Sequence, residues 1–498
     1  MAFSSQLKEI IADFHEKILP QITHRSIDYE IVPHKIITVT GVRRAGKTCF
    51  LYQIMHTLVQ KGVPKQSILY LNFEDDRLSE ITVKELSKIL DCYFELYPEN
   101  KKKKVYLFLD EIQNIGEWEK FVRRLHDSEE AQIFVSGSSA KLLSREIATS
   151  LRGRCINYEI FPFSFGEFLI HLNNQRYELQ GKLWTHDTRQ AAGNQLNQRH
   201  RRGEGEAPAA LPREACPPPA EGDPPKAGTA RAPIIEIKET SSSRAEIKHA
   251  FNDYIKYGGY PEIIGYSERI WRKTLQDYIN LILYKDLIER HDIKNHSLVK
   301  YFIRHLLQNL SSPFSVNKFF KDMKSQGFSV GKDTLHLYLS YIEDAYAFFT
   351  VPIFSNSLRV QQVNYRKLYC VDVGLSQASV LGLAEREGAL LENLVYVELR
   401  RDDVNEIYYY KTRSSREIDF FVIRNKKERD LIQVSVDPGD RTTRKREIGG
   451  LCEAMEELSL SKSMIITRDT EERFSEKGKE IKLIPFWKWA IRHQRTTP

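Results

Sequence analysis

One short segment constrains the fold of this chain more than any other. It reads Gly41-Val42-Arg43-Arg44-Ala45-Gly46-Lys47-Thr48 and matches the pattern G-x4-G-K-[ST]. The β-branched run of residues 35–40, KIITVT, precedes it directly, and residues 47–61 follow with the apolar spacing of a helix. Gly41 and Gly46 let the loop curl so that its N–H groups face an anion at the positive end of that helix. The segment therefore predicts a strand, a phosphate-binding loop and a helix.

The side chains at the end of the loop predict how a nucleoside triphosphate and its metal are bound. Lys47 reaches the β- and γ-phosphates as a mobile point charge. Thr48 supplies a hydroxyl to Mg2+, which keeps most of its waters and takes few protein ligands. We expect the nucleotide to contact Gly41, Val42, Arg43, Arg44, Ala45, Gly46, Lys47, Thr48 and Cys49. By composition, the odds of a chance match in a chain of this length are roughly a few percent.

A second motif lies in residues 105–111, VYLFLDE, where an apolar strand ends in two acids. Behind a P-loop this is the Walker B pattern. Asp110, together with Thr48, is the predicted metal residue and would hold Mg2+ through water. Glu111 would orient and deprotonate the attacking water, with Lys47 as the second catalytic residue. Two acids after a core strand also occur as a plain surface turn, but their distance from the P-loop favours a hydrolytic site.

Strand-like runs and helical stretches alternate through the first part of the chain. Strands are predicted at 35–40, 67–73, 105–109, 132–136 and 156–160, and helices at 47–61, 82–97 with Thr82 as N-cap, 118–125 and 142–151. Near-continuous apolar strands separated by helices imply a parallel sheet covered on both faces. Residues 1–170 are thus expected to form an α/β P-loop NTPase domain.

The composition changes at about residue 185. From there to about 235 the chain is rich in Pro, Ala, Gly, Glu and Arg and lacks periodicity, so it buries too little apolar surface to order itself. We expect a linker at 171–242 that carries this disordered insertion. Residues 243–355 read as helical. Helices at 315–326 and 332–343, followed by apolar runs within 347–354 that predict a β-hairpin, have the order of a winged helix.

The last part, residues 356–498, returns to strands and is expected to form a second α/β domain. Strands are predicted at 368–372, 406–411, 417–423, 431–436 and 463–467, and a helix at 388–401.

Composition and charge limit the setting of the protein. Hydrophobic residues make up 41% and charged residues 28% of the chain, as in ordinary globular proteins. No apolar run approaches the roughly 20 residues that span a bilayer, and the N-terminus lacks signal-peptide features, so we expect a cytoplasmic protein with no membrane partner. The six cysteines are scattered and predict no zinc site. The net charge of +7 permits a nucleic-acid partner without requiring one.

Several segments together resemble AAA+ ATPases, and more closely the archaeal and bacterial ATPases that carry a C-terminal domain of unknown function. These segments are GVRRAGKT, YLNFEDDRL, LFLDEIQNIGEWEKFVRRLHD, VSGSSAKLLS, LRGR and FPFSFGEFL in the N-terminal part, and YGGYPEI, YKDLIERHDI and ENLVYVELRR in the C-terminal part. The resemblance covers nearly the whole chain except about residues 185–240. It implies ATP and Mg2+ as cofactors, and no guanine-reading N-K-x-D motif is evident in the sequence.

The resemblance also implies residues that would complete an ATPase site. Ser138, after the fourth predicted strand, takes the position of the sensor that contacts the γ-phosphate or the attacking water, with Ser136 and Ser139 as rivals. Arg152 and Arg154 stand where such proteins place an arginine finger, which acts on the nucleotide of a neighbouring subunit. The alternative for both arginines is a helix C-terminus favoured by the helix dipole. A finger acting in trans implies a homo-oligomer.

The pattern after Gly388 resembles the PD-(D/E)xK nuclease fold. That chemistry needs an acid on one strand and E-x-K on the next, to hold Mg2+ and polarise the phosphate. Asp419 matches the strand acid and Glu392 a helix acid, but the E-x-K position reads Gln433-Val434-Ser435. We therefore expect a nuclease-like scaffold without nuclease activity.

Two functions remain open from the sequence. One is an ATP-hydrolysing enzyme whose turnover moves the C-terminal domains. The other is a nucleotide-gated DNA- or protein-binding switch with little turnover. Glu111 favours the enzyme, because a pure switch does not need a catalytic base. The predicted recognition helix carries Lys332, Thr334, His336 and Ser340, which suit DNA and protein partners equally.

Overall fold

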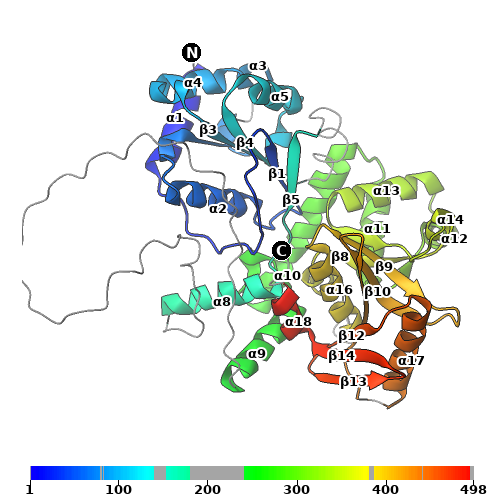
Figure 1. The fold of residues 1–498 in the computed structure, drawn as a ribbon. Coiled ribbons are helices and arrows are strands. Elements are labelled where there is room, and N and C mark those ends of the chain that lie inside the picture. The colour runs from blue at the N-terminus through cyan, green and yellow to red at the C-terminus, as the bar shows by residue number, and fades with distance from the viewer. Residues whose placement is uncertain are drawn as a thin grey trace, which may run out of the picture.

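The computed structural model describes residues 2–78, 81, 83–138, 153–179, 241–380, 386–439 and 441–493. Within these ranges the chain forms three sheets surrounded by helices. Figure 1 shows the N-terminal and C-terminal sheets at opposite ends of the molecule, with the middle helices between them. Expectations about secondary structure that fall outside the described ranges are Thr82 as an N-cap, the helix at 142–151 and the insertion at about 185–235.

The N-terminal sheet is parallel and has five strands in the order β2-β3-β4-β1-β5. The strands are β1 (Ile36–Thr40), β2 (Ile68–Asn72), β3 (Val105–Asp110), β4 (Ala131–Gly137) and β5 (Cys155–Glu159). Every predicted strand is present, and the sheet confirms the expected α/β P-loop architecture. Because all strands of this sheet are parallel, the loop that follows β1 lies at the carboxyl edge of the sheet, where ligands bind in α/β folds.

Helices cover both faces of this sheet. On one face, α2 (Lys47–Gln60) packs into a core that contains the stacked rings of Phe108 and Phe134, 4.2 Å apart. On the other face, a separate apolar cluster is formed with α1 (Ala2–Glu16), α4 (Lys88–Leu96) and α5 (Trp118–Ser128). The helix expected at 82–97 is broken at Ser87 into α3 (Val83–Leu86) and α4. α4 packs against α1, which is distant in the sequence, and the helical periodicity of residues 82–97 does not predict this contact.

α8 (Phe165–Leu179) follows the N-terminal sheet. The middle region, residues 243–355, begins with helices, as predicted: α9 (Ser241–Tyr257), α10 (Glu268–Leu281) and α11 (His296–Gln308). α10 continues directly into a π-helical segment, Ile282–Glu289. This segment is buried along one side through Ile282, Leu283 and Leu287, so its position is held by the apolar core.

A three-stranded sheet in the order β6-β8-β7 follows, with β6 (Pro313–Phe314), β7 (Phe348–Val351) and β8 (Arg366–Cys370). Both pairings are antiparallel. The helices α12 (Val316–Ser325) and α13 (Lys332–Asp344) separate β6 from β7, and α14 (Leu358–Val363) lies in the β7–β8 connection.

Two expectations about this region are wrong. Residues 347–354 supply one strand rather than a complete hairpin, because the partner of β7 is β8. The strand expected at 368–372 belongs to this small sheet and not to the C-terminal α/β sheet. Periodicity identifies a strand but does not identify its partner, which is set by the tertiary fold.

The C-terminal sheet is mixed and has six strands in the order β13-β14-β12-β11-β10-β9. The strands are β9 (Asn405–Lys411), β10 (Glu417–Arg424), β11 (Glu428–Ser435), β12 (Lys462–Thr467), β13 (Glu472–Glu476) and β14 (Lys479–Pro485). The helices of this part are α15 (Val373–Ser379), α16 (Glu387–Arg400), α17 (Arg441–Glu457) and α18 (Phe486–His493). The predicted helix and the remaining predicted strands are present, whereas β13, β14, α15, α17 and α18 were not predicted.

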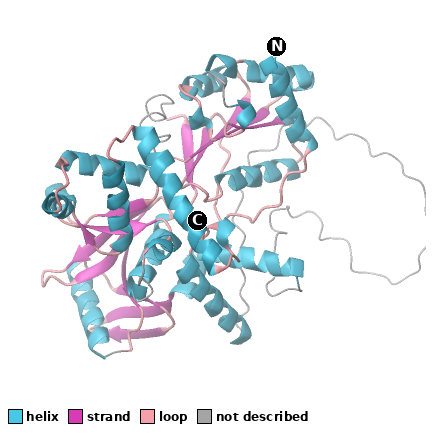
Figure 2. Ribbon diagram, turned by 180° about the vertical axis from the view of Figure 1, so that it is seen from behind, coloured by secondary structure: helices cyan, strands magenta, loops and turns pink. Residues whose placement is uncertain are grey.

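Buried contacts join these parts. One apolar core extends from α2 through the middle helices to α16 and α18. At its border the Arg401 guanidinium donates to the carbonyl of Pro162 (2.8 Å), and the Tyr346 hydroxyl donates to Glu159 (3.2 Å) at the end of β5. Figure 2 shows the middle helices between the two large sheets from behind. No described helix combines the length and apolarity that a membrane span requires.

Candidate nucleotide-binding site

The loop after β1 has the backbone shape that its glycines predict. Gly41 has φ 140°, and a Cβ there would lie 2.0 Å from the carbonyl oxygen of Ile160. Gly46, at the start of α2, has φ 97°. Both values lie in the region that favours glycine. Arg44 adopts φ 65° without being a glycine, which is the kind of backbone strain found at ligand sites.

Lys47 is the first residue of α2, at the end of the loop, and is almost fully buried. Its Nζ is 3.4 Å from the Oε1 of Glu111 and 3.4 Å from the carbonyl oxygen of Val42. Burial raises the pKa of Glu111, but Lys47, Gln113 and Arg43 together more than offset this, so the pKa lies below its usual value. Gln113 also donates to Glu111. The structure thus brings together the two side chains that the sequence analysis expects to bind phosphate and to activate water.

Thr48 and Asp110 meet beside this pair. The Thr48 hydroxyl donates to Asp110 Oδ2 at 2.8 Å, and the Tyr70 hydroxyl donates to the same oxygen at 2.9 Å. Asp110 is fully buried, and burial raises its pKa above the usual range. A hydroxyl and a carboxylate are oxygen donors of the kind that Mg2+ prefers, and Mg2+ needs few of them from protein. The donor set fits the predicted metal.

Of the three serines considered as sensors, Ser136 contacts the two Walker B acids. Its Oγ donates to Asp110 and accepts from the backbone N–H of Glu111 at 3.0 Å. Ser138 is buried, and its Oγ lies 3.5 Å from Asp286 Oδ1. Ser139 lies outside the described residues. The structure therefore connects Ser136 to the metal side of the site and Ser138 to a residue of the middle region.

The remaining predicted residues are placed as follows. Val42 and Ala45 are buried in the core, and Cys49 is exposed at the start of α2. Arg152 lies outside the described residues. Arg154 precedes β5, and its carbonyl accepts from the N–H of Ile36 at the start of β1. It therefore lies at the sheet edge opposite the loop, and its guanidinium is 3.2 Å from Asp127.

Three family models match the chain. One, described as an AAA domain, covers residues 33–169; two, described as domains of unknown function, DUF8612 and DUF4143, cover residues 248–387 and 387–489. An uncharacterized protein of Methanocaldococcus jannaschii is 34% identical over 481 residues, spanning 95% of this chain and 91% of the relative. The chain belongs to this family of AAA-domain proteins. An uncharacterized protein of Haemophilus influenzae is 25% identical over 411 residues, 82% of this chain and 84% of the relative.

Solved structures resemble this AAA-domain protein only weakly as whole chains. AMPPCP-bound DnaA from Aquifex aeolicus is 13% identical, and the match has a TM-score of 0.23. It covers 67% of this chain and 86% of the DnaA chain. The Aeropyrum pernix Orc1 protein in complex with DNA is 11% identical, and the match has a TM-score of 0.25. It covers 76% of this chain and 91% of the Orc1 chain. The family assignment rests on the sequence relatives.

A buried ion pair beside the P-loop could not be expected from the sequence. Arg25 is 1% exposed, and its guanidinium donates to Glu167 on α8 at 3.0 Å. The same guanidinium donates to the backbone oxygens of Ala45 and Phe161, both at 2.6 Å. Arg25 thus supports the P-loop from behind. Its segment has no motif, and in a single sequence no signal distinguishes it from a surface arginine.

Both arginines of the P-loop contact the middle region of this AAA-domain protein. The Nε of Arg43 lies 3.0 and 2.9 Å from the two carboxylate oxygens of Asp286, in the π-helical segment. Arg44 is 3.3 Å from Glu262 and lies over the ring of Tyr278. The loop was expected to contact the nucleotide, and these contacts across more than two hundred residues have no counterpart in the motif.

Glu392 and Asp419, the acids that the sequence analysis compared with a nuclease motif, lie around a lysine that it did not single out. Lys367, on β8, lies 3.0 Å from Glu392 on α16, 2.8 Å from Asp419 and 3.0 Å from Glu417, both on β10. Asp419 Oδ2 accepts from the backbone N–H of Val434 at 2.9 Å. Asp419 and Glu392 therefore do come together, with an ammonium group between them.

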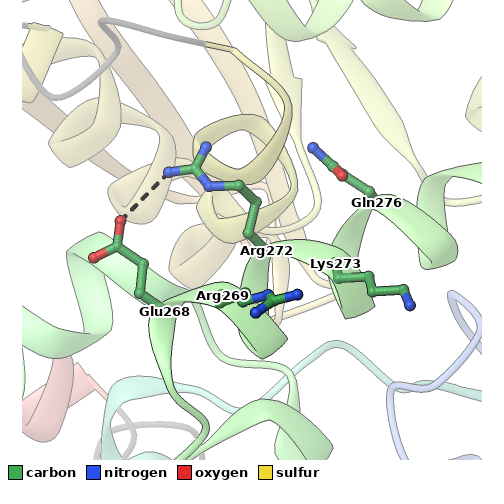
Figure 3. A pocket seen from close by; sticks show the side chains of 5 residues that line it. All are labelled: Glu268, Arg269, Arg272, Lys273 and Gln276. Carbon is green, nitrogen blue, oxygen red and sulfur yellow. Dashed lines mark hydrogen bonds and ion pairs between the residues drawn. The ribbon is translucent and has the colours of Figure 1, made fainter.

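An open concavity lies elsewhere on this AAA-domain protein, on the surface of α10. Figure 3 shows its lining of Glu268, Arg269, Arg272, Lys273 and Gln276. Arg272 pairs with Glu268 at 3.5 Å, and Gln276 donates to the carbonyl of Ala378. One helix supplies the whole lining, whereas the P-loop site is built from converging strands and helices, so this concavity does not compete with the P-loop as a candidate site.

Proposed function

We propose that this protein binds ATP with Mg2+ at the P-loop and hydrolyses it. The observation that carries the proposal is the meeting of Lys47 with Glu111 at 3.4 Å beside the hydrogen bond from Thr48 to Asp110. These contacts bring a phosphate-binding cation, a base and two oxygen donors for a metal to one sheet edge. Phosphoryl transfer requires positioned charges of this kind more than covalent chemistry.

Each residue has a distinct part in this proposal. Lys47 and the N–H groups of the loop hold the phosphates. Thr48 and Asp110 hold Mg2+, which neutralises developing charge when it is bound. Glu111, whose pKa lies below its usual value, is ionised at neutral pH and accepts a proton from the attacking water. Ser136 or Ser138 serves as the sensor, since both lie in the site.

The first prediction concerns Glu111. Glu111→Gln keeps the size of the side chain and removes the base, so steady-state turnover of ATP falls by about 10²- to 10⁴-fold. Binding of a fluorescent ATP analogue stays within about threefold of wild type, because Lys47 and the loop are retained. Thr48→Ala is the matched comparison and weakens Mg2+-dependent binding itself. Equal turnover in Glu111→Gln and wild type would contradict the assignment.

The alternative from another class is a nucleotide-gated switch with little turnover. The contacts of Arg43 and Arg44 with the middle region favour a coupling between nucleotide and the rest of the chain under either alternative. Turnover separates the two, because a switch shows none above background in wild type under all conditions. We favour the hydrolase, since Glu111 has the position and charge of a base.

The order α11-β6-α12-α13-β7-β8 supports a winged helix in the middle region, which would bind DNA or protein. The exposed part of α13 carries Lys332, His336 and Ser340, together with the apolar Leu337, which is 48% exposed. ATPase rates measured with and without duplex DNA identify the partner class. Stimulation by DNA would assign this face to DNA, and its absence would favour a protein partner.

We further propose that the C-terminal domain is a nuclease-like scaffold without nuclease activity. Its order α16-β9-β10-β11-α17-β12 supports the nuclease-like fold, and Gln433 and Ser435 replace the acid and the lysine of the expected motif. The carboxylates that remain, Glu392 and Asp419, are paired with Lys367. Metal-dependent cleavage of DNA that is abolished in Asp419→Ala would overturn this assignment.

A further inference from the structure

Asp286 brings a buried negative charge to the phosphate end of the P-loop. Its side chain is 1% exposed and accepts from Arg43 Nε with both oxygens. Ser138 Oγ lies 3.5 Å from Oδ1, and Arg290 lies 3.7 Å from the same oxygen. Burial raises the pKa of Asp286, while Arg43, Arg290 and Lys47 act in the opposite direction. The carboxylate is thus within electrostatic reach of the P-loop lysine.

The backbone that carries Asp286 is unusual. It lies within the π-helical segment Ile282–Glu289, and π-turns are rare and often occur at functional sites. Ile282, Leu283 and Leu287 anchor the segment in the core that joins the AAA domain to the rest of the chain. A change in the partner of Asp286 therefore acts on an element that belongs to the middle region rather than to a surface loop.

Arg43 is the cation that Asp286 shares with the site. Its guanidinium also lies 3.5 Å from Glu74, two residues beyond the end of β2. Burial lowers the pKa of Arg43, but Asp286, Glu111 and Glu74 more than offset this, so the pKa is raised. A terminal phosphate held by Lys47 would be a further anion close to Arg43. Asp286 and that phosphate would then compete for one guanidinium, and a guanidinium binds both carboxylates and phosphates well.

We propose that Asp286 is a positioning residue that reads the terminal phosphate through Arg43 and passes the nucleotide state to the middle region. The inference rests on the proposed ATP binding and names how that site is regulated. When a triphosphate is bound, Arg43 turns from Asp286 to the phosphate, and the π-helical segment loses its ionic contact with the AAA domain. A diphosphate lacks the competing group, so the Arg43–Asp286 contact persists.

Asp286→Asn tests the competition, because it keeps the shape of the side chain and removes its charge. Nucleotide affinities of the full chain are measured with ATP and ADP in the presence of Mg2+. We expect ATP to bind about tenfold more tightly than to wild type, within the usual range of coupling energies between sites, and ADP affinity to change by less than about threefold. In the Arg43→Gln background the same substitution has no such effect.

The matched control is Glu289→Gln. It removes the same charge from the same π-helical segment, but Glu289 is exposed and pairs with Lys285 on the surface at 2.8 Å. We expect it to leave both affinities as in wild type. If the role of Asp286 is merely structural, Asp286→Asn instead lowers the thermal unfolding midpoint and weakens the binding of ATP and ADP equally. This result would overturn the inference.

A second measurement uses the wild-type chain and does not depend on how the variant folds. Amide hydrogen exchange of residues 282–289 is compared with a non-hydrolysable ATP analogue and with ADP. We expect faster exchange with the triphosphate, because the segment has lost an ionic contact. Equal exchange in both states would overturn the inference but not the proposed function. Failure of wild type to bind either nucleotide would overturn both.

Discussion

Single side chains from outside the P-loop hold the loop in place. Arg25 makes hydrogen bonds to Ala45 and Phe161 while its charge is paired with Glu167. Each partner is buried, so neither charge is compensated by water if the other is removed. A buried pair of this kind contributes little net stability as a pair, but breaking it leaves an uncompensated charge in the core.

Arg25→Met is therefore expected to lower the free energy of unfolding of the AAA domain by about 3–5 kcal/mol, because Glu167 remains buried without its partner. Chemical denaturation measures the loss. The double variant Arg25→Met, Glu167→Leu is the control, and it is expected to recover a large part of the lost stability, since neither charge is then buried. A double variant no more stable than the single variant would contradict the explanation.

At the scale of elements, Lys367 ties the three-stranded sheet to the C-terminal domain. It comes from β8, whereas its carboxylate partners come from α16 and β10. Burial and the neighbouring Asp419 raise the pKa of Glu392 to about 8, although Lys367 lowers it. The junction between these elements is therefore sensitive to protonation.

The sign of that sensitivity follows from the raised pKa of Glu392. Between about pH 4.5 and pH 8 the folded protein keeps a proton on Glu392 that the unfolded chain releases, so stability falls as pH rises through this window. The expected slope is on the order of 1 kcal/mol per pH unit. Glu392→Gln should flatten it, as measured by denaturation at several pH values. Glu406→Gln, an exposed carboxylate on β9, should keep the wild-type slope.

At the scale of the whole molecule, the position of Arg154 bears on assembly. It lies at the sheet edge opposite the P-loop of its own chain, so it cannot serve that site without a second subunit. We propose a homo-oligomer in which Arg152 or Arg154 reaches the nucleotide of a neighbour. An arginine finger is worth about 10³- to 10⁵-fold in turnover.

One of the single variants Arg152→Ala and Arg154→Ala is accordingly expected to bind ATP normally and to lose turnover by at least about 10³-fold. Mixing that variant with Lys47→Ala should restore part of the activity, because one subunit supplies the P-loop and the other the arginine. Wild-type turnover in both single variants, or no recovery on mixing, would contradict a shared site.

Local chemistry in the sequence accounts for much of this fold. A P-loop is flanked in the sequence by its own strand and helix. The apolar strand that ends in two acids is likewise a pattern of adjacent residues. Gly41, Lys47, Thr48, Asp110 and Glu111 could therefore be assigned a place before any coordinates. The strands β1 to β4 were predictable for a related reason, because burial on both faces leaves a nearly continuous apolar run.

Contacts between distant residues could not be read in this way. Arg25 beneath the P-loop, Asp286 on Arg43, Lys367 between Glu392 and Asp419, and the pairing of β8 with β7 each join segments whose own sequences carry no sign of the partner. A charged side chain has the same local pattern whether it faces water or a buried partner. Its role was decided by packing of the chain, because only packing removes water and brings the opposite charge within about 3 Å.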